Sequence, residues 1–160
     1  MRRIGKRRSG PWYGEERERV FFELNAFRYF PTLQRQYTRL DSEGPGCLYC
    51  VRIEVPFYET RHIQIFFVAY GTGDVPIILA DGPTESPHRF SDFDRKRLCI
   101  WYQEDPRDLR WTRQDGLVHL LGLIRAHLFR EAWWRDTGYG EWLGPQAPHN
   151  AADATREIDR

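Results

Sequence analysis

Short connections between runs of strand-forming residues constrain the fold of this chain most. Cys47–Pro56 alternates in polarity, and His62–Tyr70 is rich in Ile, Phe and Val, as a buried strand is. Weaker strand patterns lie before and after these runs, at Gln34–Asp41 and at Val75–Ala80. Because only a few residues separate consecutive runs, and a parallel crossover needs a dozen or more, the strands can pair only antiparallel. The sequence therefore predicts a four-stranded antiparallel meander.

Two helices are predicted, one before the meander and one after it. Glu15–Tyr29 has apolar residues at helical spacing and stops before Pro31. Its predicted apolar face consists of Val20, Phe21, Leu24 and Phe27. The second helix starts near Thr112, which can form a capping box with Asp115. Its apolar stripe consists of Leu117, Leu120, Leu121, Ile124 and Leu128. The predicted fold is an α+β layer, with the helices packed on one face of the sheet.

Composition restricts the class of protein. The chain has 160 residues, of which 41% are hydrophobic, and this fits one globular domain rather than a disordered chain. The formal net charge of +1 argues against nucleic acid as a partner, although a basic arm occupies residues 1–14. No apolar run reaches the length of a membrane span, and no secretion signal is present. Together with three cysteines, an odd number, these features predict a cytoplasmic protein with free thiols.

The candidate chemistry lies in the long loop between the last strand and the last helix. Asp81–Arg110 is rich in prolines, and long irregular stretches in compact domains tend to be functional. Within it, Cys99 follows the basic run Arg95–Arg97. Positive charge favours the nucleophilic thiolate, and His88 could accept or donate a proton. Cys99 is therefore the candidate nucleophile, and a small buried cysteine with a packing role is the alternative.

The remaining cysteines and glycines do not indicate a metal or nucleotide site. Cys47 and Cys50 form a CxxC pattern, but zinc needs a second pair of ligands, and the two residues would point to opposite faces of a strand. The Gly-rich pieces Gly71–Gly73 and Gly138–Gly140 lack the Lys-Ser/Thr of a phosphate-binding loop. We therefore expect neither a metal nor a cofactor.

The five histidines divide by position in the chain. His119 and His127 lie off the apolar stripe of the last helix and are predicted at the surface, and His62 opens a strand. His88 and His149 each follow a proline in a loop, so either could assist the candidate nucleophile.

The order of these elements resembles that of ubiquitin-conjugating enzymes. That family has a helix, a four-stranded antiparallel meander, a loop with the nucleophilic Cys and a following helix, and a His-Pro-Asn tripeptide lies shortly before the Cys. Here Ser86-Pro87-His88 stands in the comparable place, and Leu98-Cys99-Ile100-Trp101 resembles the family's Cys followed by apolar residues. His88 occupies the position of the Asn, which in the family helps to hold the loop and the oxyanion.

The C-terminal part looks like the bacterial branch of that family, because the long last helix carries Trp133-Trp134 and the sequence continues as Trp142–His149. Stand-alone members of the branch occur in short type II CBASS anti-phage operons, where they join the C-terminus of a cyclic-oligonucleotide synthase to target amines. The resemblance implies a ubiquitin-conjugating-enzyme-like domain at residues 15–149 and a polar tail at 150–160. It also implies that Cys99 forms a thioester with the synthase C-terminus and passes it to a lysine of an acceptor protein, assisted by His88 or His149.

Three other functions remain open at this stage. One is a catalytically inactive, conjugating-enzyme-like binding module in which Cys99 is merely packed. The others are a nucleic-acid-binding protein that uses the basic arm and the tryptophans, and a cysteine hydrolase, for which no triad order is recognisable.

Overall fold

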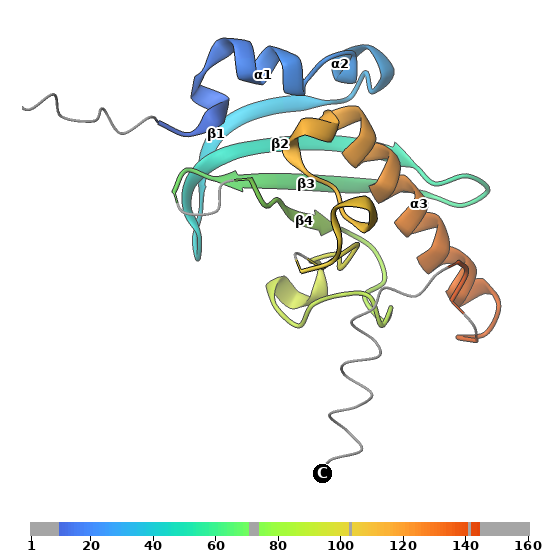
Figure 1. The fold of residues 1–160 in the computed structure, drawn as a ribbon. Helices are drawn as coiled ribbons and strands as arrows, with labels where there is room; N and C mark the ends of the chain where they lie inside the picture. Colours follow the sequence, from blue (N-terminus) through green and yellow to red (C-terminus); the bar gives the residue numbers. More distant parts are fainter. Residues whose placement is uncertain (1–9, 71–73, 103, 141, 145–160) are drawn as a thin grey trace, which may run out of the picture.

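A four-stranded antiparallel sheet with helices on one face forms the centre of the protein (Figure 1). The structure, a computed structural model, describes residues 10–70, 74–102, 104–140 and 142–144. The strands, in sheet order, are β1 (Gln34–Leu40), β2 (Gly44–Glu54), β3 (Thr60–Val68) and β4 (Ile77–Ala80). The helices are α1 (Glu16–Phe22), α2 (Ala26–Tyr29) and α3 (Gly116–Asp136), with short 3-10 turns η1 (Trp12–Gly14), η2 (Phe93–Arg95), η3 (Arg107–Leu109) and η4 (Arg113–Asp115). The predicted α+β meander is confirmed.

Two strands begin at residues other than the predicted ones. The first hairpin turn spans 41–43, and β2 already begins at Gly44, whose φ of 82° favours glycine. β4 begins at Ile77 rather than at Val75, because Pro76 has no N–H to donate to the neighbouring strand. Residues 1–9 of the basic arm, the Gly-rich piece at 71–73, His149 and the tail at 150–160 lie outside the described residues.

The alternation in β2 sets the two faces of the sheet. Tyr49, Val51 and Ile53 face α1 and α3 and belong to the main core. Leu48 and Cys50 face away from the helices, in a smaller apolar cluster. All five residues of the predicted α3 stripe are exposed by 2% or less, which confirms that this stripe packs on the sheet.

The first helix departs from the prediction. Asn25, with a φ of 62°, adopts the left-handed conformation and separates α1 from α2. Phe22 and Ala26 are buried, and Phe22 packs edge-on against Phe67, with ring centroids 5.5 Å apart. The predicted apolar face is consequently exposed to solvent: Val20, Phe21, Leu24 and Phe27. The prediction of one continuous helix was wrong because Asn25 divides it, and the predicted apolar face is not the buried one because Phe22, rather than Val20 or Phe21, faces the core in α1.

The start of α3 follows its predicted cap. The capping box of Thr112 and Asp115 is present, with the Thr112 N–H donating to Asp115 Oδ2 at 2.7 Å. These residues form the 3-10 turn η4, and the α-helix itself begins at Gly116. Among the residues that the structure describes, no helix combines the length and the apolarity needed to cross a bilayer.

Candidate functional site

The loop after β4 folds back along the edge of the sheet. The Leu98 N–H donates to the Ile78 carbonyl at 2.8 Å, and the Ala80 N–H donates to the Lys96 carbonyl at 2.9 Å. Residues 96–98 thereby extend the sheet beyond β4. Figure 1 shows this loop beyond β4, at the edge of the sheet opposite to β1 and α1.

The same segment forms one arm of a second small hairpin, which we call the Cys hairpin (residues 88–99). The Cys99 N–H donates to the His88 carbonyl at 2.8 Å, and the Phe90 N–H donates to the Arg97 carbonyl at 3.0 Å. Between these bonds, Arg89 pairs with Leu98 as an isolated antiparallel bridge. The register makes His88 and Cys99 cross-strand neighbours, the arrangement in which side chains of two strands meet. The two residues singled out in the sequence are therefore brought together.

The position of Cys99 in a loop beside Arg95–Arg97 predicts a thiol nearer the surface than those of Cys47 and Cys50, and the structure differs from this prediction. Cys99 is 5% exposed and Cys47 is fully buried, whereas Cys50 is partly exposed. Cys99 lies on an arm that is paired on both sides, with the His88 segment and with β4, and this pairing limits access to it.

The basic run next to Cys99 is engaged within the loop. Arg95 donates from Nε to the Thr84 carbonyl at 3.1 Å and from Nη2 to the Ser86 carbonyl at 3.2 Å. Arg97 pairs with Asp92 at 2.9 Å, and its guanidinium carbon lies 4.7 Å from the ring centroid of Phe90. These guanidinium groups hold the loop and hairpin in shape.

A buried ion pair joins the Cys hairpin to α3. Arg89 donates from Nε to Glu131 Oε1 at 2.9 Å and from Nη2 to Glu131 Oε2 at 2.8 Å. His127 Nε2 lies 3.5 Å from Glu131 Oε1, one turn earlier on the same helix. Burial alone would raise the pKa of the Glu131 carboxyl, but the contacts with His127 and Arg89 outweigh burial and hold that pKa at about 2. Glu131 is therefore a buried anion at neutral pH.

This cluster was missed in the sequence. His127 is buried, so its predicted place at the surface was wrong, whereas His119 is exposed as predicted. The signal that could have found it is spacing: His127 and Glu131 follow Ile124 by three and seven residues, and these positions continue the apolar stripe of α3. A buried carboxylate needs a partner of opposite charge, and Arg89 is that partner for Glu131.

The chain returns to the site after α3. The Trp142 ring centroid lies 4.0 Å from that of His88 and 5.5 Å from that of His127. His88 is almost completely buried, and its backbone N–H donates to Ser86 Oγ at 3.2 Å. Trp142 thus covers both imidazoles. The second candidate histidine, His149, lies outside the described residues.

A small pocket lies next to Cys99. Its volume is about 290 Å³, and it is bordered by the residues on either side of Cys99 in the chain, Leu98 and Ile100, and by Trp101 and Tyr102. The lining is mostly apolar, with Arg97 and Glu104 as charged members. A pocket of this size and polarity can hold one or two apolar side chains of a peptide.

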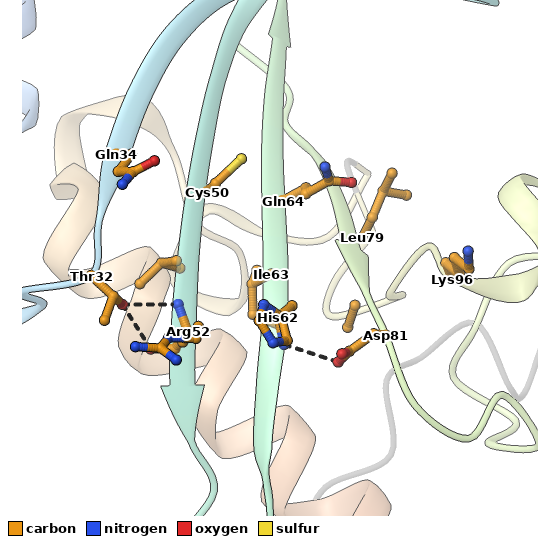
Figure 2. Close-up of a pocket in the computed structure, with 12 residues that line it drawn as sticks. Thr32, Gln34, Cys50, Arg52, His62, Ile63, Gln64, Leu79, Asp81 and Lys96 are labelled. Carbon is orange, nitrogen blue, oxygen red and sulfur yellow. Dashed lines mark hydrogen bonds between the residues drawn. The ribbon is translucent and has the colours of Figure 1, made fainter.

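A wider groove of about 570 Å³ lies elsewhere, on the sheet face that the helices leave open (Figure 2). Cys50 stands there between Gln34 and Gln64, its partners on the neighbouring strands. Burial raises the pKa of the Cys50 thiol, although a hydrogen bond with Gln64 opposes this, so the thiol is protonated at neutral pH. The groove offers polar lining without an activated nucleophile.

Cys47 and Cys50 point to opposite faces of β2, as predicted. Within the described part of the chain, no three His, Cys, Asp or Glu side chains are grouped so that they could hold a metal ion. Comparison of the chain with models of protein families, with curated proteins and with solved structures returns no match.

Proposed function

We propose that the protein is a ubiquitin-conjugating-enzyme-like acyltransferase in which Cys99 is the nucleophile. The observation that carries the proposal is the pairing of Cys99 with His88, across a hairpin that follows a four-stranded antiparallel meander. This is the arrangement that the resemblance to ubiquitin-conjugating enzymes implies, with Ser86-Pro87-His88 in the place of the tripeptide.

The reaction has two steps in this proposal. The Cys99 thiolate attacks the carbonyl carbon of a partner's activated C-terminus, forms a thioester and displaces the activating group. A lysine amine of the acceptor then attacks the thioester carbonyl, forms an isopeptide bond, loses a proton to a nearby base and releases the thiolate. The chain contains no phosphate-binding motif, so the acyl group arrives activated or comes from an existing acyl bond.

The residues around Cys99 fit separate tasks. His88 is placed to take the proton of the amine or to donate to the oxyanion, and His149 remains the second candidate for this role. The apolar pocket beside Cys99 suits an apolar side chain near the end of the donor peptide. By resemblance to the bacterial branch, the donor is the C-terminus of a cyclic-oligonucleotide synthase and the setting is anti-phage defence.

A second candidate function is an inactive binding module of the same fold. The burial of Cys99 favours it, because a thiol that is 5% exposed reaches a protein carbonyl only after local opening. In that case Cys99 fills the core and the pocket beside it binds a peptide without reaction.

A peptide with the synthase C-terminal sequence, made as a small-molecule thioester, separates the two functions. The transferase forms an adduct on non-reducing gels that reducing thiols remove. Cys99→Ser should give an adduct that resists thiols, since an oxyester exchanges slowly, and Cys99→Ala should give none. Cys50→Ser is the matched control and should load normally. Conjugates formed by Cys99→Ala at the wild-type rate would eliminate Cys99 as the nucleophile.

His88→Ala tests the second step. If His88 acts on the amine or the oxyanion, loading persists while transfer to a lysine-containing acceptor slows by about 100-fold or more. Equal loss of loading and transfer would instead place the defect in folding or binding.

A further inference from the structure

The Arg89–Glu131 pair has a geometry that determines where the Cys hairpin sits. Both side chains are almost completely buried, and the guanidinium meets the carboxylate through two parallel hydrogen bonds. A bidentate pair of this kind fixes distance and rotation together, whereas a single contact fixes only distance.

Arg89 also joins three segments of chain at one point. Its Nη1 donates to the Ala80 carbonyl at the end of β4, at 3.1 Å, and lies 3.4 Å from the Arg95 carbonyl near the turn of the hairpin. Its other two nitrogens bind Glu131 on α3. A single guanidinium therefore ties the sheet edge and the hairpin to the long helix.

The connection from Arg89 to Cys99 is short. The residue before Arg89 is His88, whose carbonyl accepts the Cys99 N–H, and the residue opposite Arg89 is Leu98, which precedes Cys99. Displacement of Arg89 consequently moves both neighbours of the thiol. Glu131 reaches the hairpin directly through the two hydrogen bonds from Arg89. A longer contact runs through His127, whose ring centroid lies 6.1 Å from that of His88.

We propose that Glu131 is a positioning residue, which orients Cys99 and His88 through Arg89; this role in conjugation rests on the proposed function. Stability alone does not account for a buried ion pair, because desolvation of two charges offsets most of their attraction. What the pair supplies is a fixed orientation for the hairpin that carries the nucleophile.

The decisive variant replaces both members, Arg89→Met together with Glu131→Leu. Apolar residues of similar volume often replace a buried ion pair without loss of stability, so this variant should fold. It lacks the two parallel hydrogen bonds between the guanidinium and the carboxylate. Arg89→Lys is the second variant, and it keeps the positive charge while losing the bidentate geometry. Glu23→Gln is the matched control, since it breaks another Arg–Glu pair, with Arg35, between the α1–α2 turn and β1.

Two measurements are made at a temperature at which every variant is folded. The first is the rate at which iodoacetamide modifies Cys99 relative to Cys50, followed by peptide mass spectrometry, and it needs no partner. The second is single-turnover transfer of the preloaded peptide to an amine. We expect the labelling ratio to change about tenfold and transfer to slow about 10- to 100-fold in both Arg89 variants. The Glu23→Gln control should leave both within about twofold of wild type.

Each outcome decides the question. An unchanged labelling ratio in both Arg89 variants would overturn the proposal, and so would an altered ratio with normal transfer. Restoration of wild-type values by the apolar pair would show that Glu131 serves stability only. Failure of the proposed function has a different signature, because the wild-type protein would then form no thioester, and the labelling ratio alone would decide whether Glu131 positions Cys99.

Discussion

Protonation of Glu131 should lower the stability of the folded protein in acid, and Glu131→Gln should remove this contribution. In the folded protein the pKa of this carboxyl is about 2, against an ordinary value of 4.5, because His127 and Arg89 outweigh the effect of burial. The carboxylate therefore stabilises the folded state at every pH above about 4.5. As the pH falls from there towards 2, the unfolded chain takes up a proton that the folded protein does not, and the stabilisation is lost.

The size of the effect follows from the two pKa values. Their difference corresponds to on the order of 3 kcal/mol of unfolding free energy, lost between about pH 5 and pH 2. Other carboxylates add their own pH dependence, so the quantity to compare is the slope of stability against pH. Glu131→Gln cannot titrate at this position and should lose less stability over the same range, although it starts from a lower value at pH 7.

Urea unfolding at pH 5, 4 and 3, followed by circular dichroism, measures the two slopes. Glu85→Gln is the control, because it removes an exposed carboxylate and should follow wild type. Parallel curves for wild type and Glu131→Gln would refute the argument that the Arg89–Glu131 pair holds a buried charge.

Three further outcomes are expected. Leu121→Ala should cost about 2–5 kcal/mol, because Leu121 is fully buried in the α3 stripe, and an unchanged melting temperature would contradict this packing. Brief alkylation should modify Cys50 first, Cys99 second and Cys47 last, because burial raises the pKa of the Cys47 thiol to about 11. Mass spectrometry gives the order, and early labelling of Cys47 would contradict the sheet register. Gly46→Ala should lower the melting temperature, because the added Cβ would lie 2.3 Å from the Phe67 carbonyl oxygen, and a neutral effect would show that β2 and β3 separate easily there.

The sequence was sufficient for elements whose pattern repeats along the chain. The alternation of β2 and the stripe of α3 each recur several times, so one irregular residue does not obscure them. The first helix was predicted as one element, but a single residue in the left-handed conformation, Asn25, divides it into α1 and α2. Asn is among the residues that adopt this conformation most readily, but a single Asn is too weak a signal to predict a break.

The candidate site was predictable only in part. The position of Cys99 and His88 in one loop indicated a site, and pairing in the hairpin confirmed that they are neighbours. The contact of Arg89 with Glu131 joins positions 42 residues apart, and Trp142 reaches His88 from beyond α3. Spacing can place Glu131 on the buried stripe of α3, but the partner that it meets there depends on how the helix crosses the sheet.

The exposed apolar face of α1 and α2 has a consequence for handling the protein in solution. Phe21 is 66% exposed and Leu24 is 60% exposed, on adjacent turns of a short segment. Salts such as sulfate strengthen the association of apolar surface, so solubility should fall steeply as sulfate is added. Phe21→Lys should raise the solubility limit in static light scattering. The melting temperature should change little, because most of the Phe21 side chain is already exposed in the folded protein.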